Sequence, residues 1–232
     1  SIGITKTKIR NKLIFKKKFF SFTLSKYKGS QPLINCAEFL NGYAFKSKDA
    51  VETSNTQLLR MGNLYENRLD LNRKPIFYPD KYTNEYKNFV LKTGDIVITL
   101  TGTVGKRDYG YAIKIQGTDK NLLLNQRILK LHNLNNKIID PDYLLFVLRS
   151  EPFLDELYST ANGTRQANLS SDKIKDIHIP LPSLNEQDQI VSSFKFLEEH
   201  YVKINDYYRK KIFNLEALKN AFLFQDLETK SA

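Results

Sequence analysis

Two polar segments of the chain contain the side-chain types that proteins use to contact DNA. In residues 99–107, two glycines and small hydroxyl residues precede a basic pair, so backbone N–H groups can approach a phosphate closely. Residues 162–168 carry arginine, glutamine and asparagine, which form paired hydrogen bonds with guanine and adenine edges. The candidate DNA contacts are Thr101, Thr103, Lys106, Arg107, Tyr109, Arg165, Gln166 and Asn168. A plain glycine-containing hairpin and a solvated loop are equally open interpretations.

Several short patterns resemble catalytic motifs, but each has a better structural interpretation. The first segment lacks the G-x-x-x-x-G-K-[ST] spacing of a P-loop. Asp80 and Glu85–Lys87 follow the order of the PD…ExK nuclease motif, but they lie too close together. Asp140–Tyr143 resembles the catalytic turn of amino methyltransferases, but no glycine-rich loop precedes it, so a helix N-cap followed by proline is favoured. The histidines, which show no metal-ligand spacing, are His132, His178 and His200. The sequence therefore predicts neither a catalytic nor a metal site.

The charge of the chain favours a polyanionic partner. The formal net charge is +11 and the isoelectric point is about 9.5. Residues 1–30 hold nine Lys/Arg and no Asp/Glu, interleaved with aromatic residues. We therefore predict a basic, aromatic N-terminal arm at 1–30 in front of a globular part that is nearly neutral. A merely basic soluble protein is the alternative interpretation.

Cysteine usage and hydropathy point to the cytoplasm. Cys36 is the only cysteine, so no disulfide can form within the chain, as is usual in a reducing compartment. No apolar run approaches the roughly 20 residues that span a bilayer. The apolar residues between 13 and 20 are interrupted by three lysines, which excludes a signal-peptide core there. We expect no membrane partner. Because the chain begins at Ser1 without Met, we expect a processed, tagged or excised fragment.

Residues 31–182 are predicted to form a strand-rich α+β domain. Strand-like runs separated by turn residues occur at 95–100, 109–115, 125–131 and 177–181. Two helical patterns lie between the last two runs, with Asp140 and Ser150 as their N-caps and Gly163 as a stop. Because strands and helices do not alternate regularly, a mixed α+β fold is favoured over a doubly wound sheet.

Residues 183–226 are predicted to form one long helix, followed by a tail at 227–232. Ser183 and Glu186 form a capping box, and no Gly or Pro follows. A helix over 184–225 would be roughly 60 Å long at 1.5 Å per residue, so we expect it to project and pair as a coiled coil with another helix. A helix folded back on its own domain is the alternative. The predicted interface stripe is Ile190, Phe194, Leu197, Tyr201, Ile204, Tyr208, Leu215, Leu218 and Phe222.

An ordered set of short blocks resembles the specificity subunits of type I restriction–modification systems. Each block is weak alone, but the set follows the family's order over about 35–225. The blocks are residues 41–47 (NGYAFKS), 59–64 (LRMGNL), 91–98 (LKTGDIVI), 101–106 (TGTVGK), 124–127 (LNQR), 168–170 (NLS) and 177–182 (IHIPLP), then Glu186-Gln187 and Ile190. Residues 1–30 match nothing in the family.

The resemblance implies a target recognition domain at 31–182 and a spacer helix at 183–226. Such subunits have no catalytic centre and no cofactor of their own: S-adenosylmethionine, ATP and Mg²⁺ belong to partner subunits. The implied partners are double-stranded DNA, methyltransferase (modification) subunits and a second copy of the chain through its helix, with the restriction subunit left open. A full subunit has two recognition domains and two helical regions, so this chain resembles a half-subunit or an excised half.

The expected function is therefore sequence-specific DNA recognition that directs methyltransferase and restriction subunits to a bipartite target. We expect residues 63–90 to help set specificity. Two alternatives stay open: the recognition part of a fused type II restriction–methylation enzyme, and a stand-alone DNA-binding repressor. A nuclease or methyltransferase would need signatures that the sequence lacks.

Overall fold

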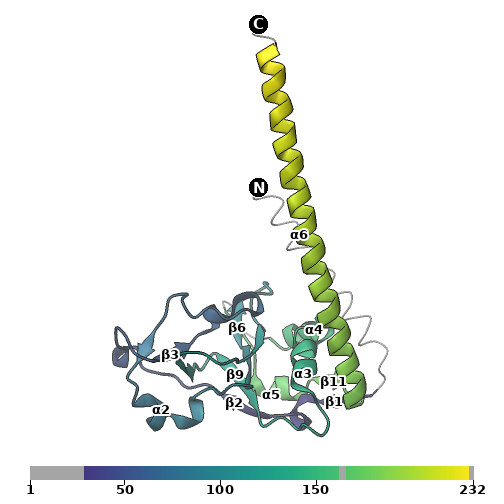
Figure 1. Ribbon diagram of the computed structural model, residues 1–232. Coiled ribbons are helices and arrows are strands. Elements are labelled where there is room, and N and C mark those ends of the chain that lie inside the picture. The colour runs from purple at the N-terminus through teal and green to yellow at the C-terminus, as the bar shows by residue number, and fades with distance from the viewer. Residues whose placement is uncertain (1–28, 162–165, 230–232) are drawn as a thin grey trace. The chain divides into compact units, whose positions relative to one another are not determined.

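The computed structural model describes residues 29–161 and 166–229, except for the side chains of 166–167 and 222–229 (Figure 1). The predicted arm up to residue 28, Gly163, Arg165 and the last three residues of the predicted tail lie outside the described residues. The chain divides into two compact units, Ser1–Asp188 and Gln189–Ala232. The fold is mixed α+β with a long C-terminal helix, as predicted.

A four-stranded antiparallel sheet forms the centre of the first unit, in the order β2-β9-β5-β7. The strands are β2 (Glu38–Asn41), β5 (Ile96–Thr99), β7 (Ala112–Lys114) and β9 (Ile128–His132). All four residues of β5 are buried. The Asp95 carboxylate accepts a hydrogen bond from Lys92 N at 2.8 Å and pairs with the buried Lys130 at 3.6 Å. All four predicted strand runs are confirmed: 95–100, 109–115 and 125–131 each contain most or all of one strand of this sheet, and 177–181 contains β11 (His178–Pro180).

A second sheet joins strands that the sequence did not single out. Here β3 (Thr56–Leu59) pairs in parallel with β8 (Asn121–Leu124) and antiparallel with β4 (Phe77–Tyr78). Its buried leucines join a core with Val97 and Ile128 of the central sheet. Aromatic rings from β4 and from α2 (Tyr82–Glu85) pack on its other side, around Leu58 and Leu123.

Two capped helices cross the unit as predicted. Helix α3 (Pro141–Leu148) begins after Asp140, whose side chain accepts hydrogen bonds from the backbone N of Asp142 and Tyr143. Helix α4 (Glu151–Ser159) begins after Ser150, whose hydroxyl accepts from Phe153 N at 3.4 Å. Further elements are η1 (Leu33–Asn35), η2 (Ser47–Asp49), η3 (Met61–Asn67), η4 (Lys87–Phe89), α5 (Ser171–Asp176) and the paired strands β1 (Ser30–Pro32) and β11 (His178–Pro180).

Helix α6 (Leu184–Thr229) begins with the predicted capping box. The Glu186 carboxylate accepts from Ser183 N at 2.9 Å, and the Ser183 hydroxyl accepts from Glu186 N at 3.4 Å. The Ser183 hydroxyl also donates to the Glu186 carboxylate at 2.7 Å, and this bond, with the one from Ser183 N, holds the pKa of Glu186 below its usual value. The 46 residues correspond to about 69 Å of helix.

The first turn of α6 belongs to the globular unit. Gln187 is fully buried, and its side-chain oxygen accepts from Asp140 N at 2.8 Å. Its amide nitrogen donates to the carbonyls of Ile138 and Pro182, both at 2.8 Å. One glutamine therefore joins the start of α6 to the N-terminus of α3.

We expect Gln187→Ala to lower the free energy of unfolding by about 1–3 kcal/mol, because it leaves buried backbone groups without partners. Gln189→Ala is the matched control, since Gln189 is exposed two residues further along the same helix. Denaturant unfolding measures both. Equal stability of the two variants would show that the three bonds contribute nothing.

Candidate nucleic-acid interface

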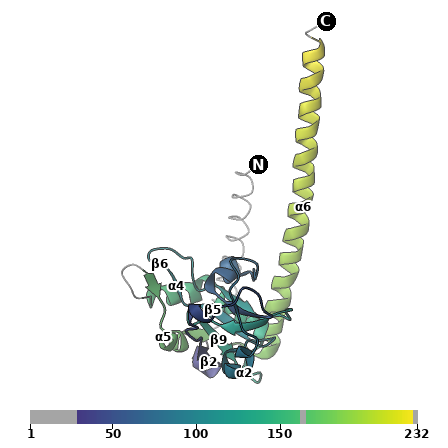
Figure 2. The same ribbon diagram turned by 90° about the vertical axis from the view of Figure 1, so that its left-hand side faces the viewer.

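The two predicted DNA-contact segments meet in one two-stranded sheet. Strand β6 (Thr101–Thr103) pairs antiparallel with β10 (Gln166–Asn168), with Thr103 opposite Gln166 and Thr101 opposite Asn168. A bond from Leu169 N to Leu100 O at 2.9 Å continues the pairing. Strand β6 follows the buried β5 after a single residue and reaches the upper edge of the unit in Figures 1 and 2. The central sheet therefore carries this pair of strands to the surface.

An aspartate closes the turn after β6. Asp108 accepts hydrogen bonds from Thr103 N at 2.8 Å and from the Thr103 hydroxyl at 2.7 Å. Partial burial would raise the pKa of Asp108, but these bonds outweigh it and hold the pKa below its usual value. Lys106 N bonds to Thr103 O at 3.0 Å, and Gly105 has a φ of 75°. The turn thus has a fixed shape, with the Lys106 side chain exposed at its tip.

The threonines of β6 face different surroundings. Thr101 is 7% exposed, and its hydroxyl lies 3.0 Å from the sulfur of Met61 in η3. Thr103 is exposed, but its hydroxyl is engaged by Asp108. Asn168 is exposed on β10. Gln166 has its backbone in β10, while its side chain and all of Arg165 lie outside the described residues.

Arg107 and Tyr109 fasten the segment to α4. The Arg107 guanidinium pairs with Glu151 at 2.7 Å and also with Asp155, and lies 4.7 Å from the centre of the Tyr158 ring. The Tyr158 hydroxyl donates to Tyr109 O at 2.9 Å. Tyr109 is 4% exposed, and burial raises the pKa of its phenol. Its ring is therefore unavailable to a base in this conformation, and the charge of Arg107 is neutralised.

The residues that resembled catalytic motifs have structural partners. The Asp80 carboxylate accepts from the hydroxyls of Ser54 and Thr56, both at 2.7 Å, which lowers its pKa. Glu85 pairs with Lys81 one helical turn away, at 3.3 Å. Within residues 29–161 and 166–229 no group of three His, Cys, Asp or Glu side chains is placed to hold a metal ion. Among the helices that the structure describes, none is long and apolar enough to cross a membrane.

The family model for the type I restriction modification DNA specificity domain matches residues 8–212. The chain belongs to this family. It is 34% identical over 124 residues to the MjaVIII specificity subunit of Methanocaldococcus jannaschii, which covers 53% of the chain and 28% of that protein. It is 30% identical over 155 residues to the EcoAI specificity subunit of Escherichia coli, covering 66% and 25%. The chain thus spans about a quarter of the length of these specificity subunits.

Solved structures show the same fold. A structure of a type I restriction–modification system, from work on its complex assembly and conformational transition, superposes with a TM-score of 0.62 at 14% identity, covering 94% of the chain and 53% of the other. The specificity subunit (HsdS) from Thermoanaerobacter tengcongensis superposes with a TM-score of 0.55 at 13% identity, covering 86% and 48%. At these identities the likeness establishes the architecture of the specificity domain.

The β6 segment depends on a glycine at its centre. A Cβ on Gly102 would lie 2.3 Å from Cδ1 of Tyr109 and 2.5 Å from Oδ1 of Asp108. Since Tyr109 is buried, we expect Gly102→Ala to destabilise the chain by about 1–3 kcal/mol. Gly117→Ala is the control, because nothing lies within 4 Å there, and its effect should stay within about 1 kcal/mol. Urea unfolding compares them; a Gly102→Ala chain as stable as wild type would refute this packing.

Proposed function

We propose that this specificity domain reads the DNA target of a type I restriction–modification system and leaves the chemistry to partner subunits. Family membership supports DNA sequence recognition. Methyl transfer and ATP-dependent restriction would then belong to the methyltransferase and restriction subunits, together with S-adenosylmethionine, ATP and Mg²⁺. Such a complex acts on DNA in the cytoplasm.

The pairing of β6 with β10 carries the DNA-reading part of the proposal. It brings exposed Asn168 into one two-stranded element with β6 and the turn that carries exposed Lys106, although 62 positions separate the two residues in the chain. We assign Lys106 to a backbone phosphate, since its ammonium is an exposed point charge at the tip of a rigid turn. Asn168, with Gln166 and Arg165 beside it in sequence, has the chemistry to read base edges. Arg107 and Tyr109 brace the element.

We assign α6 to assembly. Outside its first turn, four members of the predicted apolar stripe are at least half exposed in the single chain: Ile204 (54%), Tyr208 (54%), Leu215 (56%) and Leu218 (53%). Covering each such side chain is worth up to roughly 1.5–3 kcal/mol, so an unpartnered stripe is costly. A second copy of the helix offers the same stripe. A two-fold antiparallel pair would hold two recognition domains at fixed separation, over two half-sites in inverted repeat.

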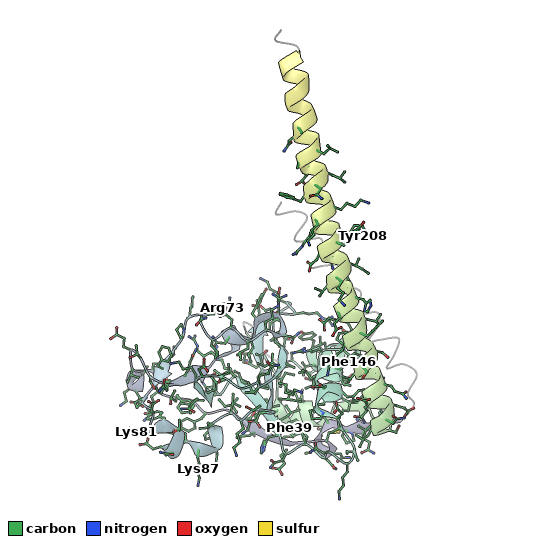
Figure 3. All side chains as sticks on the ribbon, in the orientation of Figure 1. Phe39, Arg73, Lys81, Lys87, Phe146 and Tyr208 are labelled. Atoms are coloured by element: carbon green, nitrogen blue, oxygen red, sulfur yellow. The ribbon has the colours of Figure 1, made fainter. Side chains whose placement is uncertain are left out.

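A randomised duplex library tests the proposal. The wild-type chain should enrich a short motif, in gapped inverted repeats when it is dimeric. Lys106→Ala should weaken binding to every duplex and reduce the slope of log K against log salt by about one unit, without changing the motif. Lys87→Ala controls for lost charge, since Lys87 lies on the lower edge of the unit in Figure 3. Wild-type chains that enrich no sequence would refute the proposal. An unchanged salt slope in Lys106→Ala would show that Lys106 does not contact a phosphate.

The helix pairing has its own test. We expect the wild-type chain to sediment as a dimer, and Leu197→Asp with Ile204→Asp to sediment as a monomer, because charges in an apolar seam are costly to bury. Ser192→Asp with Lys203→Asp is the control, with two aspartates on exposed positions off the stripe. A wild-type chain that stays monomeric at tens of micromolar, or a control pair that also dissociates, would contradict the assignment of the stripe.

A further inference from the structure

A second surface element lies beside β6, formed by residues 60–74. Met61 contacts Thr101 through the bond already described. Asn67 accepts a hydrogen bond from Ala112 N of β7 at 2.8 Å. The Tyr65 ring packs edge-to-face on Tyr111, with centroids 5.5 Å apart. Residues 60–74, which we call the arginine loop, are thus fixed against the strand that follows the β6 turn and continue the same surface.

A buried asparagine sets the shape of the arginine loop. Asn63 is 1% exposed, and its side-chain oxygen accepts from Arg60 N at 2.9 Å. Its amide nitrogen donates to Asp70 O at 2.8 Å and to Arg73 O at 3.0 Å. Gln57 of β3 adds a bond to Leu71 O at 2.6 Å. The side chain of Asn63 therefore holds the backbone of Arg73 in place.

The backbone of the loop is strained at three positions. Glu66, Asn67 and Lys74 have φ values of 54°, 60° and 49°, which non-glycine residues rarely adopt. Such strain persists only where surrounding contacts enforce it, and it clusters at ligand-binding sites. Here the buried Leu64 and the bond from Ala112 to Asn67 enforce it. The strained backbone keeps Tyr65 at the surface, 49% exposed.

The guanidinium of Arg73 lies over an aromatic ring, whereas that of Arg107 is paired with two carboxylates. It stacks over the Tyr65 ring, with Cζ 5.3 Å from the ring centroid, and Tyr65 rests on Tyr111. Arg73 is exposed, and within the described part of the chain no carboxylate lies within ion-pair distance of it. Stacking fixes the plane of a guanidinium while its fork of donors stays available. Figure 3 shows Arg73 on the upper edge of the unit, the edge that β6 reaches in Figure 1.

We propose that Arg73 reads a guanine edge in the major groove, that Tyr65 orients it, and that Asn63 is the positioning residue of the loop. The inference rests on the proposed function and adds a second reading element to the β6–β10 pair. Guanine is the expected base because its O6 and N7 accept the paired donors of arginine. The neighbouring Arg68 and Lys74, both exposed, have the charge for flanking phosphates.

The test is the same library selection with the full chain, comparing wild type, Arg73→Ala, Arg73→Lys and Lys87→Ala. Both Arg73 variants should lose the preference for G·C at one position and bind the wild-type motif roughly 5- to 100-fold more weakly. Arg73→Lys should retain wild-type affinity for random-sequence duplex, because its charge is kept but its fork is lost. Lys87→Ala should enrich the wild-type motif.

Tyr65→Phe and Asn63→Asp separate orientation from folding. Tyr65→Phe keeps the ring under the guanidinium and should enrich the wild-type motif. Asn63→Asp keeps the acceptor but loses both donated bonds and buries a carboxylate, so it should lower stability and blur the same base position in chains that circular dichroism shows to be folded. If wild type selects a motif and Arg73→Ala selects the same one, the inference is overturned while the proposed function stands. If wild type selects nothing, both are overturned.

Discussion

The antiparallel pairing of β6 with β10 is the interaction on which the candidate interface depends. It joins segments more than 60 residues apart, and it starts one residue after the buried strand β5. Because β5 is held on both sides by β7 and β9, the position of β6 is set by the core of the domain. The helix α4 then fixes the far end of the segment through Arg107 and Tyr109. If this element reads DNA, as proposed, it loses little conformational entropy on binding.

Local signals in the sequence predicted the elements that local chemistry determines. Asp140, Ser150 and the Ser183–Glu186 box each start a helix, because a cap needs only the next few residues. Strand β5, a β-branched run, was predicted for the same reason. Strands β3 and β8 were missed, because their sequences TQLL and NLLL carry helix-favouring leucines without alternation. They are strands because they pair in parallel with each other and their two faces are buried in two hydrophobic clusters.

The candidate site also combines features that local sequence determines with features that depend on contacts between distant segments. The glycines and the basic pair predicted a turn around Lys106, and the structure has that side chain exposed in a turn after β6. They could not foresee that Arg107 is neutralised, because its carboxylate partners lie 44 and 48 residues away. Nor did they single out Arg73, whose availability follows from Asn63, Tyr65 and Tyr111. Composition shows which residues can bind DNA, and only the fold shows which of them are already occupied.

The residues that support the candidate interface and the exposed residues that we propose to contact DNA are separate sets. Gly102, Tyr109 and Asn63 are buried or tightly packed and hold backbone positions, whereas Lys106, Asn168 and Arg73 are exposed and hold none of the core. Exchanging an exposed residue changes a contact without leaving a buried group unpaired, so it costs little stability. Exchanging a supporting residue moves the whole loop. If these exposed residues read DNA, as proposed, the domain can acquire a new target by changing a few surface side chains on an unchanged frame.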